Sequence, residues 1–466
     1  MSPESARPSG VDVAIVGGGA AGVLVATRLL ADPACRLRIA IVEPAVELAR
    51  GAAYATGQPA HLLNVTAGRM SAFAEDPGHF VRFLSGGDAG AADALSSSFA
   101  PRREYGRYLR ETLHAQPRHP ALQWLREQVT DIERRAGCNL LTLASGATLV
   151  ARAVVLAVGN TPRRIPAARL HGAVRLADAW DYEGVAAIPA DADVCIIGSG
   201  LSMVDAVLSL FHGGHRGRIR VLSRHGLMPL AHAGSGGADN APVDALLALG
   251  LRDRLRLVRA WTRAADAAGE PWQWVFDRLR PHGQALWRSL THVEQQRFLR
   301  HLVRYWDIHR HRIAPQVAHA LEALRAGDRL DVLAGRLQSV EAGGDGGITV
   351  RYRPRHGDGE CTIRADWLVN ATGVETHIDL RPDTLMGALR MRGRVLPGPH
   401  GIGIASEEPG RVIDARGQPD PTLLVLGAMR IGTLWESLAI PELRGQAQAL
   451  AECLRAMLEE PVDSPA

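Results

Sequence analysis

Three glycines near the start of this chain, spaced as G-x-G-x-x-G, form the pattern with which a backbone holds a pyrophosphate. In Gly17, Gly19 and Gly22, the first glycine allows a tight turn, the second lets the pyrophosphate approach the backbone, and the third lets a helix pack closely on a strand. The apolar run 13–16 before them predicts a buried strand, and the small residues after them predict a helix whose N-terminus favours anions. The expected ligand is a dinucleotide.

An acidic residue in the right place supports this interpretation. A second apolar run, 37–42, ends in Glu43, about 20 residues after the glycines, where a carboxylate would accept a hydrogen bond from a ribose hydroxyl. A glycine-rich turn without a ligand is the alternative, because G-x-G-x-x-G alone is a weak signal. The strand before the glycines, the helix after them and Glu43 together favour the nucleotide site.

The chain repeats this pattern in its middle. An apolar run at 194–197 is followed by Gly198 and Gly200, then by Ser202, and Met203 stands where a third glycine would be. The repeat predicts a second dinucleotide unit, in which the methionine would keep helix and strand further apart.

The next predicted strand of this second unit, 219–223, ends without an acid. It ends in Ser223, followed by Arg224. A carboxylate at this place favours NAD, whereas an arginine and a small hydroxyl favour the 2′-phosphate of NADP. An exposed arginine at a strand end, with no ligand, is the alternative.

The composition excludes several other kinds of protein. A chain of 466 residues has room for two or three domains. All 53 basic residues counted as Lys+Arg are arginine, so a lysine Schiff base is excluded. The arginines are scattered and form no basic stripe, so we expect no nucleic-acid partner. The apolar stretch 11–30 is interrupted by glycines, and we expect no membrane span.

The cysteines indicate a compartment and argue against dithiol chemistry. Five cysteines, at positions 35, 138, 195, 361 and 453, form no C-x-x-C pair, so we expect neither a zinc ribbon nor a redox dithiol. Scattered cysteines suit a reducing cytoplasm, and the polar start has no signal-peptide core. We therefore expect a cytoplasmic protein without a metal site.

A long region with helical periodicity follows the second glycine motif, over 242–324. We expect its tryptophans to be core residues rather than a binding stripe. They are Trp261, Trp272, Trp274, Trp287 and Trp306. Near its end, His309, Arg310 and Arg312 are candidates for contact with an anionic substrate. A metal site is less favoured, because the two histidines there are two residues apart and do not share a helix face.

Three further apolar strands stop at glycine, at Gly159, Gly373 and Gly427. This is typical of a chain that leaves a sheet. The pattern predicts an α/β fold with two Rossmann-like dinucleotide-binding domains, the second inserted in the first, and a helical insertion. We expect the first domain over 1–186 and 365–466. The second would span 187–364, with the insertion at 242–324.

Through these motifs, the chain resembles the flavoproteins with two dinucleotide-binding domains. Among them it is most similar to the flavin-dependent N-hydroxylating monooxygenases of the ornithine and lysine type. Besides Gly17-x-Gly19-x-x-Gly22 and Glu43, four groups of residues carry this resemblance. They are Met70 with Asp76-Pro77, Phe80 and Phe83-Leu84; Arg103-Glu104-Tyr105 with Tyr108; Gly198-x-Gly200-x-Ser202; and Asp366-x-x-x-Asn370-Ala371-Thr372-Gly373. Asn370, Val374 and the Trp-rich insertion depart from the pattern of the hydroxylases.

The resemblance implies FAD in the first unit and NADPH in the second, with hydride passing from nicotinamide to flavin. The loop 61–73 would line the flavin with His61, Asn64 and Met70, and the helix opening near Thr433 would stabilise the anionic reduced ring. The residues expected to bind the cofactors are Gly17, Gly19, Ala20, Ala21, Gly22, Glu43, Arg103, Gly159, Gly198, Gly200, Ser202, Ser223, Arg224, Thr372, Gly373, Gly427, Thr433 and Trp435.

The expected function is that of an FAD-dependent, NADPH-using oxidoreductase. We expect a single-component monooxygenase that acts with O2 on a small molecule, with nitrogen as a candidate site of oxygenation. An NADPH-dependent flavin reductase without oxygenation and a non-catalytic flavin-binding redox sensor are the alternatives. The missing dithiol argues against a disulfide reductase. The oligomeric state stays open.

Overall fold

The first sheet is built around the N-terminal strand β1 (Gly10–Val16), which pairs in parallel with β2 (Ile39–Val42) and β6 (Thr148–Leu156). A computed structural model describes residues 10–234, 242–344, 346–378 and 381–459 of the chain. In order across the sheet, the strands are β17 (Ser406–Glu407), β18 (Arg411–Ile413), β19 (Pro419–Val425), β6, β1, β2 and β3 (Leu122–Leu125), with β4 (Val129–Arg135) and β5 (Cys138–Leu143) joined to β6 as an antiparallel meander.

Apolar side chains alternate between the two faces of this sheet, and each face has its own cover. One face packs under α1 (Ala20–Leu30), α4 (Arg102–His114) and α15 (Ile440–Glu459), with Ile15 and Ile41 fully buried beneath them. The other face packs against the meander and α13 (Leu385–Met391). The C-terminal strand β19 thus completes a sheet that starts at the N-terminus.

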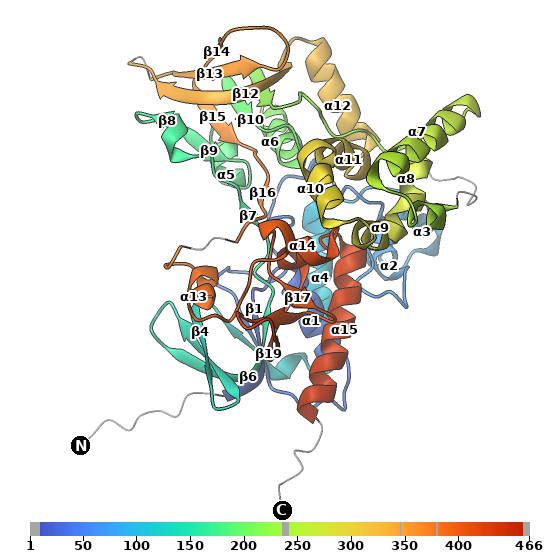
Figure 1. Ribbon diagram of the computed structural model, residues 1–466, viewed down its shortest axis with the longest axis vertical. Coiled ribbons are helices and arrows are strands. Elements are labelled where there is room, and N and C mark those ends of the chain that lie inside the picture. Colours follow the sequence, from blue (N-terminus) through green and yellow to red (C-terminus); the bar gives the residue numbers. More distant parts are fainter. Residues whose placement is uncertain (1–9, 235–241, 345, 379–380, 460–466) are drawn as a thin grey trace, which may run out of the picture.

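The second sheet repeats this arrangement. Its strands are, in order, β14 (Cys361–Ala365), β13 (Ile348–Pro354), β12 (Leu330–Ala342), β11 (Ile219–Ser223), β10 (Val194–Ile197), β15 (Trp367–Asn370) and β9 (Leu176–Asp178), with β8 (Leu170–His171) on β12. Helices α5 (Tyr182–Ala186), α6 (Leu201–His212) and α12 (Pro315–Ala326) pack on one face. Figure 1 shows the two sheets as two lobes along the long axis, with both termini at the lobe of the first sheet.

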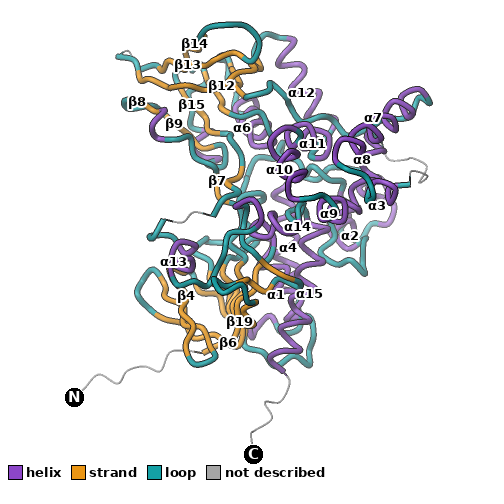
Figure 2. The backbone as a smooth tube through the Cα atoms, in the orientation of Figure 1, coloured by secondary structure: helices purple, strands orange, loops and turns teal. Residues whose placement is uncertain are grey.

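Two extended segments join the lobes. β7 (Thr161–Pro162) leaves the first lobe and pairs antiparallel with β16 (Val374–Glu375), which returns to it. Figure 2 shows β7 between the two lobes. The boundaries expected at 186/187 and 364/365 differ from this arrangement, because β8, β9 and β15 belong to the second sheet and α5 packs on it. The short strands β8 and β9 lack a recognisable period, and the apolar run of β15 does not reveal which sheet it joins.

The predicted helical insertion is present between β11 and β12. It comprises η4 (Val243–Leu246), α7 (Leu251–Ala267), α8 (Gln273–Leu279), η5 (Arg280–His282), α9 (Gly283–Arg288), α10 (His292–His301) and α11 (Val303–Arg310). α10 begins with a capping box, in which Thr291 and Glu294 bond each other's backbone N–H. The insertion ends before α12, because α12 packs Val317 and Leu321 on the second sheet as its crossover helix. We call α7–α11 with η4 and η5 the helical segment.

The tryptophans of the helical segment are unequally buried. Trp287 is 4% exposed and forms a cluster with Trp435 of the first unit, whereas Trp261 and Trp306 are half-buried and pack around small cores. The remaining short elements are η1 (Ala67–Arg69), α2 (His79–Ser85), α3 (Ala89–Ser96), η2 (His119–Ala121), η3 (Ala167–Arg169), η6 (Pro399–Gly401), η7 (Gly427–Arg430) and α14 (Ile431–Leu434). Within the described residues, no helix has the length and apolarity needed to cross a membrane.

Candidate functional site

The first glycine turn leaves space for a ligand at one position and for none at the other two. Gly17 has a φ of +106°, and a Cβ added to it would lie 2.3 Å from the carbonyl oxygen of Ala157. A Cβ on Gly22 would lie 2.0 Å from the oxygen of Gly17. On Gly19 it would meet Gly51 Cα at 3.5 Å, an ordinary contact. Gly17 and Gly22 are thus required by the protein's own packing, whereas the protein leaves room at Gly19, where the motif expects a pyrophosphate.

Glu43 holds this turn in place. One carboxylate oxygen accepts the N–H of Gly18 at 2.7 Å, and the other accepts the N–H of Ala45 at 3.0 Å. Two fixed backbone donors orient the carboxylate at the end of β2. A carboxylate has further acceptor capacity beyond these two bonds, as a ribose hydroxyl would require.

The second glycine turn has the same construction. Gly198 has a φ of +110°, and its added Cβ would lie 2.1 Å from the carbonyl oxygen of Ala371. Its N–H donates to Leu222 O at 2.9 Å, as the N–H of Gly17 donates to Val42 O at 2.9 Å. Each turn is therefore held between the two neighbouring parallel strands of its sheet, at their carboxyl ends, where open α/β sheets bind ligands.

Helix α6 begins at Gly200, its N-cap residue, and packs through Met203. The methionine is fully buried in the core of the second lobe. Ser202 accepts a hydrogen bond from Trp180 Nε1 at 3.1 Å, so its hydroxyl already has a protein partner. The backbone N–H groups at the start of α6 remain the natural anion donors of this turn.

Arg224 follows β11 and lies among other arginines. Burial lowers the pKa of Arg224, and the positive charges of Arg304, Arg163 and Arg336 lower it further. Arg304 pairs with Asp307 at 3.0 Å, and Arg163 pairs more loosely with Glu375. For Arg224 and Arg336, the described residues provide no carboxylate partner. This group is net positive and suited to a phosphate.

Ser223 completes the end of β11. Its Oγ lies 2.8 Å from Ser199 Oγ and accepts the N–H of Gly226 at 3.0 Å. Ser199 also donates to Leu227 O at 2.5 Å. The two serines link the second glycine turn to the loop that carries Arg224.

The two segments that join the lobes contain two further glycines expected to bind a cofactor, Gly159 and Gly373. Gly159 has a φ of +70° and Gly373 a φ of +92°, and open space surrounds an added Cβ at both. Thr372 Oγ1 donates to Arg163 O at 2.8 Å, and Asn370 Nδ2 donates to the same oxygen at 2.8 Å. Asn370, which departs from the hydroxylase pattern, therefore links the two segments that join the lobes.

The three residues expected to line the flavin lie in different surroundings. His61 is fully buried: Nε2 donates to Asp205 O at 2.9 Å, and Nδ1 lies 2.7 Å from Thr56 Oγ1. Burial lowers the pKa of His61, and neither ring nitrogen is free for a ligand. Met70 is 3% exposed within the first core. Asn64 is partly exposed, and its carbonyl oxygen accepts a bond from His232.

His61 belongs to a buried contact between the lobes. Beside it, Arg102 Nη1 donates to Asp205 Oδ2 at 2.6 Å, with side chains 14% and 5% exposed. This ion pair joins α4 of the first lobe to α6 of the second. The neighbouring Arg103, predicted to contact a cofactor, is exposed and reaches Gly57 O at 3.4 Å.

The C-terminal cofactor candidates lie around η7 and α14. Gly427 has a φ of +72°, and its N–H donates to Gln446 Oε1 at 3.0 Å. Thr433 is the third residue of the four-residue helix α14 rather than its start. Trp435, 9% exposed, follows α14 and packs on the helical segment. Figure 1 shows α14 at the level where the two lobes meet.

The three substrate candidates are brought near one another, but their surroundings differ. His309 stacks on Phe276, with ring centroids 5.0 Å apart. Arg310 Nε donates to Glu436 Oε2 at 3.0 Å, with side chains 7% and 6% exposed. Arg312 is bonded to Asp277. An anionic substrate at Arg310 would have to displace Glu436. The sequence did not indicate this ion pair between Arg310 and Glu436.

Sequence reasoning missed the residues that surround Arg310. Glu436 also accepts Trp306 Nε1 at 2.7 Å, and Arg280 lies near Glu442 of α15. Burial raises the pKa of Asp307, which pairs with Arg304, to about 6. No motif marked these residues, because they come from η5, α11, α15 and the turn after α14, which are far apart in the sequence. Glu436 lies within the strand–loop–helix of 423–442, and this acidic position in a predicted loop is the signal that could have found it.

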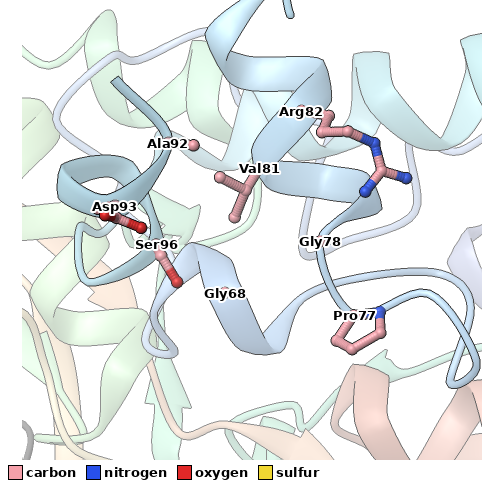
Figure 3. A pocket seen from close by; sticks show the side chains of 8 residues that line it. All are labelled: Gly68, Pro77, Gly78, Val81, Arg82, Ala92, Asp93 and Ser96. Carbon is pink, nitrogen blue, oxygen red and sulfur yellow. The ribbon is translucent and has the colours of Figure 1, made fainter. Parts of the chain in front are cut away.

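A surface hollow of about 360 Å³ lies away from both glycine turns, between η1, α2 and α3. Figure 3 shows Asp93 and Ser96 of α3 on one side of it, and Arg82 of α2 on another. Arg82 is bonded to Asp76 outside the hollow lining. The described residues contain no group of three or more His, Cys, Asp or Glu side chains that could hold a metal ion.

Comparisons with known proteins agree with the fold. A family model described as FAD-NAD(P)-binding matches residues 14–161, which include the first glycine turn and Glu43. No curated protein sequence matches the chain.

Solved structures match over nearly the whole chain. The reduced form of ornithine hydroxylase from Pseudomonas aeruginosa is 19% identical, with a TM-score of 0.65, and the match covers 96% of this chain and 99% of that one. For Kutzneria sp. 744 ornithine N-hydroxylase with reduced FAD, NADP+ and L-ornithine, the identity is 17%, the TM-score 0.63, and the coverage 97% and 100%. Bacillithiol disulfide reductase from Staphylococcus aureus is 15% identical, with a TM-score of 0.56, and the match covers 96% of this chain and 99% of that one.

These matches define the class of fold. The chain has the fold of the flavoproteins with two dinucleotide-binding domains, as its sequence predicted. The N-hydroxylating monooxygenases share this fold with it, and so does a disulfide reductase.

Proposed function

We propose that the first lobe binds FAD and the second binds NADPH. The observation that carries this proposal is the repeated glycine turn, in which Gly17 and Gly198 have matching φ angles and matching bonds to a neighbouring strand. At Gly19 the protein leaves room for a pyrophosphate, and Glu43 is oriented to accept a ribose hydroxyl. The match of residues 14–161 to a FAD-NAD(P)-binding model supports the same assignment.

NADPH is preferred over NADH in this proposal because of the charges at the end of β11. Arg224 and Arg336 have no described carboxylate partner, and Arg163 and Arg304 lie close to Arg224. A 2′-phosphate would relieve the mutual repulsion of these guanidinium groups, whereas the hydroxyl of NADH would not.

The proposed activity is that of a single-component monooxygenase for a small molecule. When bound, FAD would supply the redox chemistry, as acceptor of a hydride from NADPH and donor of electrons to O2. The helical segment packs on α14 and α15 through Trp287, Trp306 and Arg310. This cover would exclude water beside the flavin, which an oxygenation requires. The fold shared with ornithine hydroxylases supports this activity.

A reductase without oxygenation is the second candidate, supported by the disulfide reductase fold. That candidate would act on something other than a disulfide of its own, because the five cysteines form no C-x-x-C pair. A flavin-binding redox sensor without turnover is the third.

One set of measurements tests these candidates. The purified protein should absorb near 450 nm as a flavoprotein, and anaerobic NADPH should bleach that absorbance much faster than NADH. On admission of O2 with candidate amines and amino acids, a monooxygenase consumes NADPH in step with oxygenated product. Prompt release of all electrons as H2O2 with every substrate would favour the reductase, and no bleaching by NADPH would favour the sensor.

A further inference from the structure

Three arginines of the helical segment and the loop after it are buried against the first lobe. The side chains of Arg280, Arg310 and Arg312 are 8%, 7% and 4% exposed. Arg310 donates Nε to Glu436 at 3.0 Å, and its Nη2 lies 3.9 Å from Glu442 Oε1. Arg310 is therefore committed to carboxylates of the protein.

The other two arginines keep buried donors without an acceptor. Arg312 is bonded to Asp277 through Nη2, but its Nε and Nη1 have no partner among the described residues. Arg280 Nε lies 3.7 Å from Glu442 Oε1, and its Nη2 has no partner there either. Buried polar groups in proteins are almost always paired, and a charged donor left unpaired is especially costly. Among the described residues of the cluster, Glu442 Oε2 is a buried acceptor that also lacks a partner, so three unpaired donor atoms face one unpaired acceptor. The excess N–H groups call for an acceptor from outside the chain.

The charge balance indicates what that acceptor carries. The positive charge of Arg69, on η1, lowers the pKa of both Arg280 and Arg312, so it belongs to the same group. Arg280, Arg310 and Arg312 lie against the three carboxylates Glu442, Glu436 and Asp277. Arg69, whose own side chain is exposed, adds a fourth positive charge at the edge of the group. Four positive charges against three negative charges leave an excess of one.

The neighbouring titratable groups do not change this balance. Burial, together with the positive charge of nearby arginines, lowers the pKa of His311 to about 3 and that of His232 to about 4. Both histidines are therefore neutral at pH 7. Arg304 and Asp307 pair with each other at 3.0 Å.

We propose that this cluster is a binding site for the carboxylate of a monoanionic substrate, with Arg280 and Arg312 as the donors. The inference rests on the proposed function, because the cluster joins η1, η5 and the end of α11 to α15, beside α14, where the flavin is expected. One carboxylate matches the single excess charge, and its two oxygens can accept the unpaired N–H groups. A phosphate dianion would leave the cluster net negative.

The test uses the full-length protein with its flavin and three simple probes. N-acetylglycine supplies one carboxylate, N-acetylglycinamide is its neutral counterpart, and inorganic phosphate is the competing anion. N-acetylglycine should raise the Tm and change the tryptophan emission in a saturable way, since Trp306 contacts the same Glu436. The amide should do neither. This wild-type comparison stands even if a variant folds poorly.

Variants then assign the effect to residues. Arg280→Gln and Arg312→Gln should each raise the dissociation constant for N-acetylglycine at least tenfold. Arg300→Gln is the control, because Arg300 is an exposed arginine of α10 in the same segment. Equal responses to acid and amide, tighter binding of phosphate than of N-acetylglycine, or unchanged binding in both variants would overturn the inference.

The same samples separate this inference from the proposed function. Absorbance at 450 nm and anaerobic bleaching by NADPH report the flavin and its reduction, neither of which involves Arg280 or Arg312. Normal bleaching without a carboxylate effect would refute the substrate site alone. Missing flavin or missing bleaching would refute the proposed function instead.

Discussion

The indole of Trp435 stacks on that of Trp287, with ring centroids 4.6 Å apart and planes inclined by 16°. Trp435 follows α14 of the first unit, whereas Trp287 lies in α9 of the helical segment. Trp435 and the next residue, Glu436, have φ angles of +51° and +45°, which are unfavourable for residues other than glycine. The stack and the Glu436–Arg310 ion pair hold this strained turn and dock the helical segment on it.

Replacing Trp287 should therefore loosen the helical segment. Trp287→Ala removes a side chain that is 4% exposed, and we expect a loss of about 3–5 kcal/mol in the free energy of unfolding. Urea unfolding followed by circular dichroism measures it. Tyr305→Ala, on a side chain 42% exposed in the same segment, is the control and should cost under about 1 kcal/mol. Equal losses in the two variants would contradict a docking role for the stack.

Two glycine variants should separate flavin binding from folding. Gly19→Val should fold, because an added Cβ meets only Gly51 at ordinary distance, yet it should lose FAD by occupying the pyrophosphate position. Gly17→Val should fold poorly, because its Cβ would lie 2.3 Å from Ala157 O and its φ is positive. Gel filtration with absorbance at 280 and 450 nm distinguishes the two outcomes. A soluble Gly19→Val protein that keeps its full yellow colour would disprove the assignment of the first turn to FAD.

Arg224→Ala should weaken the binding of NADPH and leave the binding of NADH nearly unchanged. A charge-assisted contact to the 2′-phosphate is worth roughly 1.5–3 kcal/mol, so we expect NADPH to bind about tenfold more weakly or worse. Dissociation constants from anaerobic flavin reduction at fixed ionic strength measure the change. Arg216→Ala is the matched control, since Arg216 is an exposed arginine paired with Asp191. If the NADPH and NADH constants change equally, Arg224 does not read the 2′-phosphate.

His232 should make the stability depend on pH. Burial lowers the pKa of His232 to about 4, whereas an unfolded histidine titrates near 6.5. Between these two pKa values the unfolded chain binds more protons than the folded chain. The contribution of His232 to the free energy of unfolding is therefore complete above about pH 6.5, and it declines as the pH falls toward 4. His232→Gln, whose amide can still donate to Asn64 O, should flatten the dependence of Tm on pH from 7.5 to 4.5. His171→Gln, at an exposed position, is the comparison; a wild-type slope in the His232 variant would rule out this source.

The sequence by itself determined the two nucleotide units. A run of apolar residues followed by spaced glycines is a local pattern, because the strand, the turn and the helix N-terminus lie within about 20 residues of one another. Gly17, Gly22 and Gly198 lie in the turns that the sequence predicted, and their part in cofactor binding stays a prediction. The second unit was correctly expected inside the first. The helical segment was also predicted, since the apolar periodicity of an amphipathic helix can be recognised in the local sequence.

Tertiary structure decided everything that depends on residues far apart in the chain. His61 reads as a ligand candidate in an irregular loop, but α6, more than a hundred residues later, buries it with Asp205 and Ser209. The chain passes between the lobes at β7 and β16, because β15 pairs with β9 and β10 of the second sheet. No local sequence pattern reveals this strand pairing.

The arginine cluster illustrates the same limit at the candidate substrate site. The sequence singled out Arg310, yet Glu436, 126 residues away, neutralises it. Arg280 and Arg312 keep their unpaired donors. The free energy of a charged side chain depends on the burial and the counter-charges around it. Those counter-charges come from α8, α15 and the turn after α14, and only folding brings them together.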